Sequence, residues 1–239
     1  MYQQAWWFDE RTRCGVDYSD DQIAKNYDGF QTQLHDYNHE AVEIVTMLEL
    51  HSGHTLIDMG TGTGNFAIQA APLCHHVFAV DISKSMLDVA RTKAKNHQVR
   101  NISFIQAGFL TYQHEGEPVD CVVTTAALHH LPDFWKLVAL QRIANILRPG
   151  GKLFLQDVVF PTKASTDPEI LDAWLSGMGQ LAGKTMAREA TLHIMEEYST
   201  YNWILEGMLE KAGFHIQYYD YSNHLVASYL CVKKGGGGL

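Results

Sequence analysis

Short apolar segments alternate with amphipathic ones through the middle of the chain. Residues 54–59 (HTLIDM) and 77–81 (VFAVD) are apolar runs of strand length, and a helical pattern follows each of them. The pattern continues with strands at 102–106, 119–124 and 152–158 and with helices at 65–73, 83–97 and 133–147. Alternation of this kind predicts an α/β doubly wound fold, in which a mostly parallel sheet has helices on both faces.

Two regions depart from this alternation and frame a cofactor-binding core at residues 51–160. Residues 1–50 contain no strand pattern and predict an N-terminal helical cap. Residues 161–200 predict two helices joined at a glycine, which we interpret as a lid insertion after the fifth strand. A final helix and two strands follow at 201–233, and we expect the glycine-rich tail 234–239 to be disordered.

The charge of the chain narrows the choice of partners. It carries 27 acidic and 18 basic residues, for a net charge of −9, and a negative surface repels the phosphates of a nucleic acid. No apolar run approaches the roughly 20 residues that span a membrane. Residues 1–10 also lack the basic flank and apolar middle of a secretory signal, so we expect a cytoplasmic protein.

A glycine-rich segment, Asp58–Gly64 (DMGTGTG), lies between the first predicted strand and helix. Glycines there allow a sharp turn and let a ligand approach the main chain closely. Asp58, which comes before the glycines, would repel a pyrophosphate and suits a cationic ligand such as the amino group of a methionine moiety. Asp81 ends the second strand and is suited to bind ribose hydroxyls, which are present in both adenosyl and NAD ligands.

These features resemble the successive motifs of class I S-adenosylmethionine-dependent methyltransferases. The resemblance covers roughly residues 55–160, and the segments that carry it are Asp58–Gly64, Val80–Ser83, Phe104–Phe109, Thr124–Leu131 and Leu147–Lys152 (LRPGGK). The most similar group is that of the small-molecule enzymes that include the ubiquinone/menaquinone C-methyltransferases. The resemblance implies a seven-stranded sheet of order 3-2-1-4-5-7-6 with the last strand antiparallel, and S-adenosyl-L-methionine as the cofactor.

The resemblance also implies roles for single residues. Gly60 and Gly62 would approach the ribose and methionine parts, and the main-chain carbonyl of Thr125 would accept from the ammonium group. The predicted cofactor-binding residues are Asp58, Gly60, Thr61, Gly62, Gly64, Asp81, Ile82, Met86, Gly108, Phe109, Thr125 and Tyr27.

In one respect the chain departs from the family, which often has an acidic residue after the third strand to accept a hydrogen bond from the adenine amino group. The segment here, residues 106–109 (QAGF), contains no carboxylate.

Two candidate catalytic bases, His129 and His130, follow the fourth strand. The carboxyl ends of strands line the ligand cleft in such sheets, and neutral histidine can accept a proton near pH 7. A structural role beneath the cofactor or at the start of the next helix is the alternative interpretation.

Aromatic residues in the cap and the insertion predict a lid over the acceptor, although a role in the core is the alternative. The candidates are Trp6, Trp7, Phe8, Tyr18 and Phe30 in the cap, and Trp174, Met178, His193, Met195, Tyr198 and Tyr201 in and after the insertion. Two loose groupings, His35 with His39 and His193 with Glu196 or Glu197, lack a third spaced ligand, so we predict no metal site.

The leading functional prediction is therefore in-line transfer of a methyl group to a small molecule in a dry pocket beneath this lid. We expect a monomer or homodimer with no nucleic-acid or membrane partner. The main alternative is a protein that binds the same cofactor without methylating, or that transfers another part of it. An NAD-dependent oxidoreductase is a third possibility, disfavoured by Asp58 and by the glycine spacing.

Overall fold

The computed structural model describes residues 5–12, 14–32, 36–165, 167–223 and 225–235; most of the predicted tail, together with His35, lies outside these ranges. Within them the strands form one eight-stranded sheet of order β3-β2-β1-β4-β5-β8-β7, with β6 paired to β5 off this path. The strands are β1 (Thr55–Met59), β2 (His76–Asp81), β3 (Ile102–Gln106), β4 (Val119–Thr125), β5 (Leu147–Phe160), β6 (Thr200–Tyr201), β7 (Phe214–Asn223) and β8 (Val226–Lys233).

The order of the long strands confirms the predicted topology. Strands β1 to β5 pair in parallel, and β8, the last strand of the chain, runs antiparallel to both of its neighbours. The predicted number of seven strands is wrong by one. β5 continues to Phe160, two residues beyond its predicted end, and Val159 and Phe160 pair with Thr200 and Tyr201 of β6 where the chain returns from the insertion.

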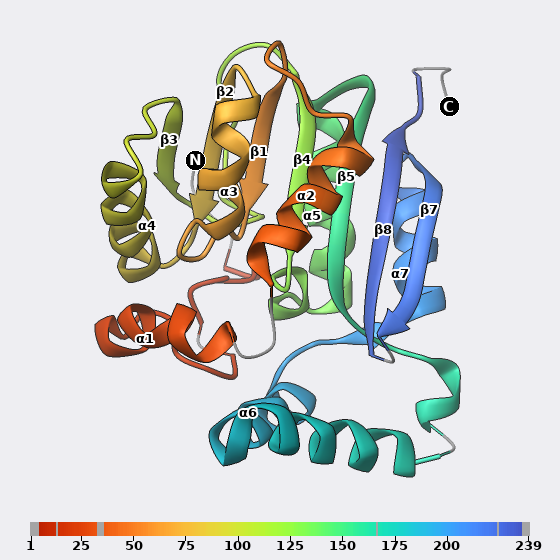
Figure 1. Cartoon of the computed structure of the whole chain (residues 1–239). Coiled ribbons are helices and arrows are strands. Elements are labelled where there is room, and N and C mark those ends of the chain that lie inside the picture. Colours follow the sequence, from red (N-terminus) through yellow and green to blue (C-terminus); the bar gives the residue numbers. More distant parts are fainter. Residues whose placement is uncertain (1–4, 13, 33–35, 166, 224, 236–239) are drawn as a thin grey trace.

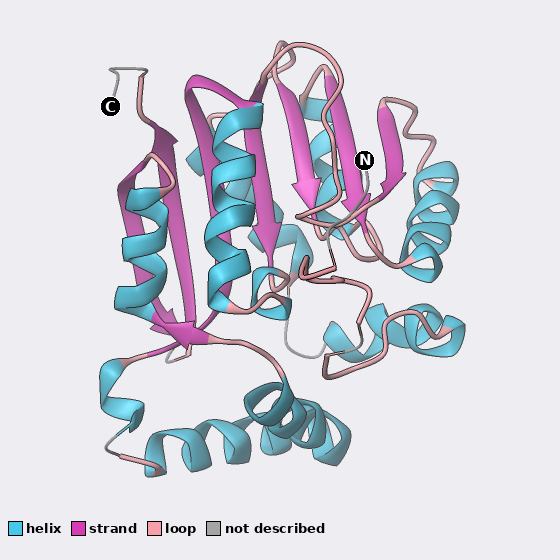
Figure 2. Cartoon of the chain, turned by 180° about the vertical axis from the view of Figure 1, so that it is seen from behind, coloured by secondary structure: helices cyan, strands magenta, loops and turns pink. Residues whose placement is uncertain are grey.

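Helices cover both faces of the sheet, with α2 and α3 on one side and α5 and α7 on the other (Figures 1 and 2). Neighbouring residues of a strand point to opposite faces. Accordingly Leu56 belongs to the apolar cluster beneath α2 and α3, while Ile57 belongs to the cluster beneath α5 and α7. The helices are α1 (Asp21–Gln31), α2 (Tyr37–Leu48), α3 (Asn65–Ala70), α4 (Lys84–Asn96), α5 (Asp133–Ile146), α6 (Glu169–Glu196) and α7 (Asn202–Lys211), with short 3₁₀ turns η1 (Ala71–Leu73), η2 (Leu128–His130) and η3 (Thr162–Ser165).

Two helices, α1 and α6, lie beyond the carboxyl ends of the parallel strands (Figure 1). The two helical stretches expected in the insertion are present and meet at Gly183, where φ is 82° and ψ is −179°, so α6 consists of two helices joined at a kink. This combination of angles is non-helical and is one that glycine adopts without steric strain, so the chain bends there without a separate loop. None of the helices in the described ranges is long and apolar enough to cross a membrane.

Helix α1 is tied to the core by the carboxylate of Asp28. Its Oδ1 accepts from Thr63 Oγ1 at 2.6 Å and from Asn65 Nδ2 at 2.9 Å, and its Oδ2 lies 2.6 Å from Lys93 Nζ. Although burial acts to raise the pKa of Asp28, these partners hold it below its usual value. The cap therefore contacts the glycine-rich turn directly.

Candidate active site

The turn between β1 and α3 exposes main-chain atoms of its glycines to a cavity. Gly60 and Gly62 have φ values of 76° and 53°, which L side chains rarely adopt. A Cβ atom on Gly60 would lie 2.5 Å from Cβ of Ala127, whereas one on Gly62 would meet nothing within 4 Å. Packing therefore requires glycine at position 60, and position 62 leaves room for a ligand against the backbone.

Asp58 lies beneath this turn rather than in the cavity. Its side chain is buried, and its Oδ2 accepts a hydrogen bond from Thr61 Oγ1 at 2.6 Å. Burial raises the pKa of Asp58 to about 7, although the bond from Thr61 acts in the opposite direction. Asp58 is not among the residues that border the cavity, so its contact with the turn runs through Thr61.

Asp81, at the end of β2, reaches the cavity with its carboxylate. Its Oδ2 accepts from the main-chain N–H of Gly62 at 2.8 Å, and its Oδ1 accepts from that of Ser83 at 2.8 Å. Burial raises the pKa of this carboxyl group, and the two N–H donors oppose the rise. The backbone therefore fixes the direction of the side chain before any ligand binds.

The cavity has a volume of about 560 Å³ and lies at the carboxyl ends of β1, β2 and β4, beneath the N-terminal segment. Such a size is typical of sites for small ligands. Most of the predicted cofactor residues border it: Tyr27, Gly60, Thr61, Gly62, Asp81, Ile82, Met86, Gly108, Phe109 and Thr125. Asp58 and Gly64 do not. The roles of all these residues toward a cofactor stay predictions.

A second hollow of about 770 Å³ lies between α2, α3 and α4. It is larger, but it is bordered by Thr32 and Asp36, which flank residues outside the described ranges, and none of the glycine-turn residues Gly60 to Gly64 borders it. The chemistry identified from the sequence converges on the smaller cavity, which we take as the candidate site.

Glu10 is a cavity residue that the sequence analysis missed. Its carboxylate accepts from the main-chain N–H of Leu110 at 3.1 Å and from Thr111 Oγ1 at 2.7 Å. A Cβ atom added to Gly108 would lie 2.3 Å from Glu10 Oε2. A carboxylate from the N-terminal segment therefore lies where an acidic residue after β3 was expected and not found. No local pattern could reveal a contact between residues about 100 positions apart.

The structure separates the two candidate histidines. His130 borders the cavity, and its ring makes an edge contact with Tyr18, 5.9 Å between centroids. Burial, followed by the neighbouring His129 ring, lowers the pKa of His130 to about 4. His129 is buried and does not border the cavity; its Nδ1 lies 2.5 Å from Oδ1 of Asp157, and its main-chain N–H donates to Oδ2 of the same residue at 3.0 Å.

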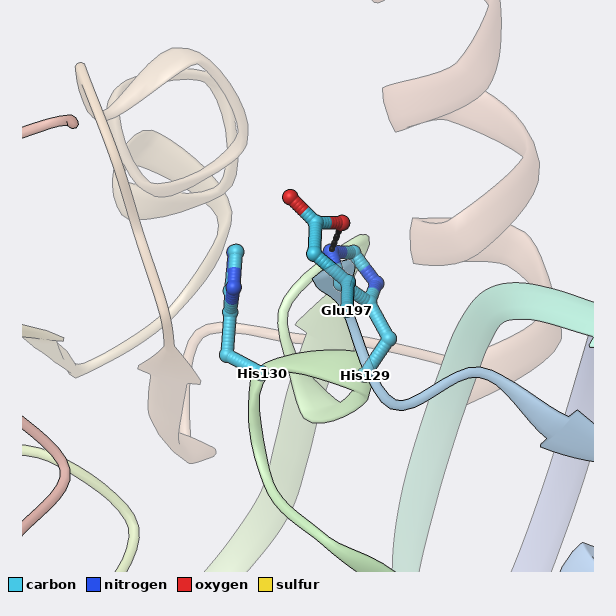
Figure 3. A group of neighbouring side chains, drawn as sticks. All are labelled: His129, His130 and Glu197. Atoms are coloured by element: carbon cyan, nitrogen blue, oxygen red, sulfur yellow. Dashed lines mark ion pairs between the residues drawn. The ribbon is translucent and has the colours of Figure 1, made fainter. Parts of the chain in front are cut away.

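A second carboxylate, that of Glu197, completes this buried group. Its Oε2 lies 3.3 Å from Nε2 of His129 and also pairs with Nδ1 of His193, and its side chain is 4% exposed. Figure 3 shows the neighbouring side chains of His129 and His130, both from η2, with the side chain of Glu197 next to His129. Glu197 lies just after α6, where the chain returns from the insertion to the core. Of the loose grouping of His193 with Glu196 or Glu197 noted in the sequence, the structure contains the pair His193–Glu197, whereas the involvement of His129 and Asp157 was not anticipated.

The aromatic lid differs from its prediction. Trp6, Trp7 and Phe8 pack on Trp135 of α5, with centroids 6.2, 4.8 and 6.3 Å from it, rather than over the cavity. Phe30 is 44% exposed. Of the aromatic residues predicted for the lid, Tyr18 alone borders the cavity, where it contacts Tyr27 at 5.8 Å. The covering is built by residues 10–12, 14 and 16–19, and no described residue of the insertion borders the cavity.

Comparisons with known proteins agree with this geometry. Residues 56–151 match a family described as a methyltransferase domain. A protein of Bacillus mycoides described as an uncharacterized methyltransferase is 28% identical over 211 residues, which cover 86% of this chain and 92% of the relative. These findings support a methyltransferase domain and identify no substrate.

Solved structures share the fold at low identity. The N-methyltransferase NodS of Bradyrhizobium japonicum, solved with S-adenosyl-L-homocysteine, superposes with a TM-score of 0.66 at 13% identity, covering 92% of this chain and 100% of that one. The [4+2]-cyclase SpnF superposes with a TM-score of 0.64, also at 13% identity, covering 94% of this chain and 100% of that one. The predicted α/β methyltransferase fold is thereby confirmed.

Proposed function

We propose that this protein binds S-adenosyl-L-methionine in the 560 Å³ cavity and transfers its methyl group to a small molecule. The observation that carries the proposal is the pairing of the Asp81 carboxylate with the Gly62 N–H at the open turn. A buried carboxylate held by main-chain donors is preorganised to accept from the two hydroxyls of a ribose. Ile82 and Met86 border the same end of the cavity and offer apolar contacts to an adenine ring.

Glu10 extends the proposal to the adenine amino group. Its carboxylate borders the cavity beside Gly108, and burial raises its pKa. Because the segment after β3 has no acidic side chain, we assign acceptance from the adenine amino group to Glu10. The cap would then take part in recognising the cofactor as well as covering it.

The bound cofactor supplies an activated methyl group on a sulfonium. The protein residues would contribute alignment and exclusion of water. Tyr18 and Tyr27 cover the cavity, and Thr125, Ala126 and His130 border it at the end of β4. We therefore place the acceptor at this β4 end, with His130 as the candidate catalytic residue that reaches it and His129 as a residue acting through its buried partners.

A small, partly apolar acceptor, in the manner of the quinone C-methyltransferase group, is the finer part of the proposal. The cavity volume of about 560 Å³ suits a small acceptor, and the net charge of −9 disfavours a nucleic acid. A monomer or homodimer in the cytoplasm belongs to the same proposal.

A thermal-shift panel tests cofactor binding. S-adenosyl-L-homocysteine should raise the melting temperature, because a ligand that binds only the folded state stabilises it, while NAD should have no effect. Stabilisation by NAD alone would contradict the proposal.

Incubation with methyl-labelled cofactor and fractionated metabolite pools tests the reaction itself. A labelled small product is expected. Cofactor binding without labelled product in any fraction would favour the alternative of a non-methylating protein, a class for which the fold likeness to the cyclase SpnF provides a precedent.

A further inference from the structure

Three side chains of the buried group offer ligand atoms to a common point. One ring nitrogen of His129, one of His130 and a carboxylate oxygen of Glu197 lie within 4.8 Å of one another. We propose that these three residues bind one divalent transition-metal ion, such as Zn²⁺, at the β4 end of the cavity. Imidazole nitrogen and carboxylate oxygen are ligands that this class of ion accepts.

The separation of two of the ligand atoms matches a coordination shell. Nε2 of His129 and Oε2 of Glu197 are 3.3 Å apart. A charge-assisted N–H···O bond is usually about 2.7–2.9 Å long, whereas two ligands bound at about 2.1 Å in a tetrahedron are about 3.4 Å apart. The observed distance is that of a tetrahedral edge.

The partners of the ligands have the arrangement found around metal sites. Nδ1 of His129 lies 2.5 Å from Asp157 Oδ1, so with its proton on Nδ1 the ring would present the lone pair of Nε2 to an ion beside Glu197. His193 pairs with Glu197 and in turn contacts Ser199 Oγ at 2.7 Å through Nε2. Outer partners of this kind fix the tautomer and direction of a ligating group.

Charge balance points the same way. The side chains of Asp157 and Glu197 are each 4% exposed, so two carboxylates are withdrawn from water at this point. One divalent cation would balance both charges and would leave the imidazoles neutral, as ligation requires. Within the described residues, Lys136 is buried near this group, but its Nζ is already bonded to Asp133 and to the Tyr198 carbonyl.

Three protein ligands leave a coordination position open, as in catalytic rather than structural metal sites. Of the three ligands, His130 borders the cavity, and we place the open position on that side. An acceptor with a carboxylate, enolate or phenolate oxygen would suit it. This role toward the acceptor rests on the proposed function, whereas binding of the metal does not.

Metal binding is tested on the full-length protein after removal of metal with a chelator. Co²⁺ and Zn²⁺ are titrated by calorimetry, and the visible absorption of the Co²⁺ form reports its coordination. About one equivalent of ion and a tetrahedral Co²⁺ spectrum are expected. Less than about a tenth of an equivalent of either ion would overturn the proposal and leave the group as an ion-pair network between insertion and core.

Variants locate the site. His130→Asn and Glu197→Gln should each weaken Co²⁺ binding by about 100-fold or more, and Asp157→Asn, which removes an outer partner, by about 10- to 100-fold. His39→Asn is the matched control, because His39 forms an exposed pair with Glu43 at 3.7 Å away from the site, and binding should be unchanged. Unaltered Co²⁺ binding in folded His130→Asn protein would overturn the assignment.

A chelating probe tests the open position. Oxalate, which offers carboxylate oxygens, should shift the visible spectrum of the Co²⁺ protein, and an unchanged spectrum would show that the ion is closed to acceptors. Calorimetry with S-adenosyl-L-homocysteine in the same variants keeps the two proposals apart. A variant that binds S-adenosyl-L-homocysteine but no longer binds the metal supports the metal site. Absence of S-adenosyl-L-homocysteine binding by the wild-type protein would reject the proposed function and leave the metal site unaffected.

Discussion

The two ends of the cavity are built in different ways. The end at β1 and β2 is formed by main-chain groups of two consecutive strand–turn–helix units, with the N–H groups of Gly62 and Ser83 directing the Asp81 carboxylate. The end at β4 lies against a buried group of side chains, in which Asp157 and Glu197 reach His129 from 28 and 68 positions away along the chain; of this group, His130 borders the cavity. The first end is preorganised by local backbone geometry, and the second depends on the insertion returning to the core.

The pH dependence of the unfolding free energy tests the burial of Asp58 beneath the β1–β2 end of the cavity. The pKa of Asp58 in the folded protein is about 7, above the ordinary value of 3.8, so the folded state retains a proton that the unfolded state releases. The stabilising contribution is therefore complete below pH 4 and is lost as the pH rises to about 7, by about 4 kcal/mol in total. The difference in unfolding free energy between Asp58→Asn and wild type, measured in urea, should rise by this amount from pH 4 to pH 8. A constant difference would contradict the buried setting of Asp58.

Substitution of Gly60 tests the same end through packing. Gly60→Ala combines a left-handed backbone with contact against Ala127 and should lower the unfolding free energy by about 2–4 kcal/mol. Gly29→Ala is the control: Gly29 lies in α1 with no atom within 4 Å of an added Cβ, so alanine should stabilise the protein by about 0.5–1 kcal/mol. Equal effects of the two substitutions would refute the special role of the turn.

Removal of the Asp81 side chain tests ligand binding at the β1–β2 end of the cavity. Asp81→Ala should weaken binding of S-adenosyl-L-homocysteine by about 1–3 kcal/mol, through loss of charge-assisted hydrogen bonds. Isothermal titration calorimetry measures the change. Unaltered affinity would remove Asp81 from the site.

The substitution Lys136→Met tests the β4 end of the cavity, where the insertion returns to the core. Lys136 joins Asp133 of α5 to the Tyr198 carbonyl, next to Glu197, and loss of this bridge should lower the local stability of residues 186–200 by about 1–2 kcal/mol. Hydrogen exchange followed by mass spectrometry should show faster exchange there and no change at residues 58–64. Acceleration at the glycine turn as well would mean that the two ends are coupled.

Substitution of Glu10, which links the cap to the proposed adenine-binding part of the cavity, should have the smallest effect. Glu10→Gln should weaken binding of S-adenosyl-L-homocysteine by about 1 kcal/mol. It should weaken binding of S-inosyl-L-homocysteine less, because inosine has a carbonyl in place of the amino group. If both ligands lose affinity equally, Glu10 does not contact the amino group.

The difference between the two ends explains what sequence could predict. The strands, the turn at 60–64 and the placement of Asp81 follow from local periodicity and glycine spacing, and the strand order followed from the family resemblance. Contacts of Glu10 with Leu110 and of Glu197 with His129 join segments that no local pattern relates. The packing of Trp6 and Trp7 on Trp135 shows the same limit, since aromatic residues suit a core as well as a lid.

The attachment of α1 has a kinetic consequence. Because Asp28 bonds to Thr63 in the glycine-rich segment, to Asn65 at the start of α3 and to Lys93 of α4, opening the cavity on this side must break a partly exposed ion pair. Ions in solution screen such pairs. Ligand residence time should therefore shorten as ionic strength rises, even where the contacts between ligand and protein are themselves uncharged.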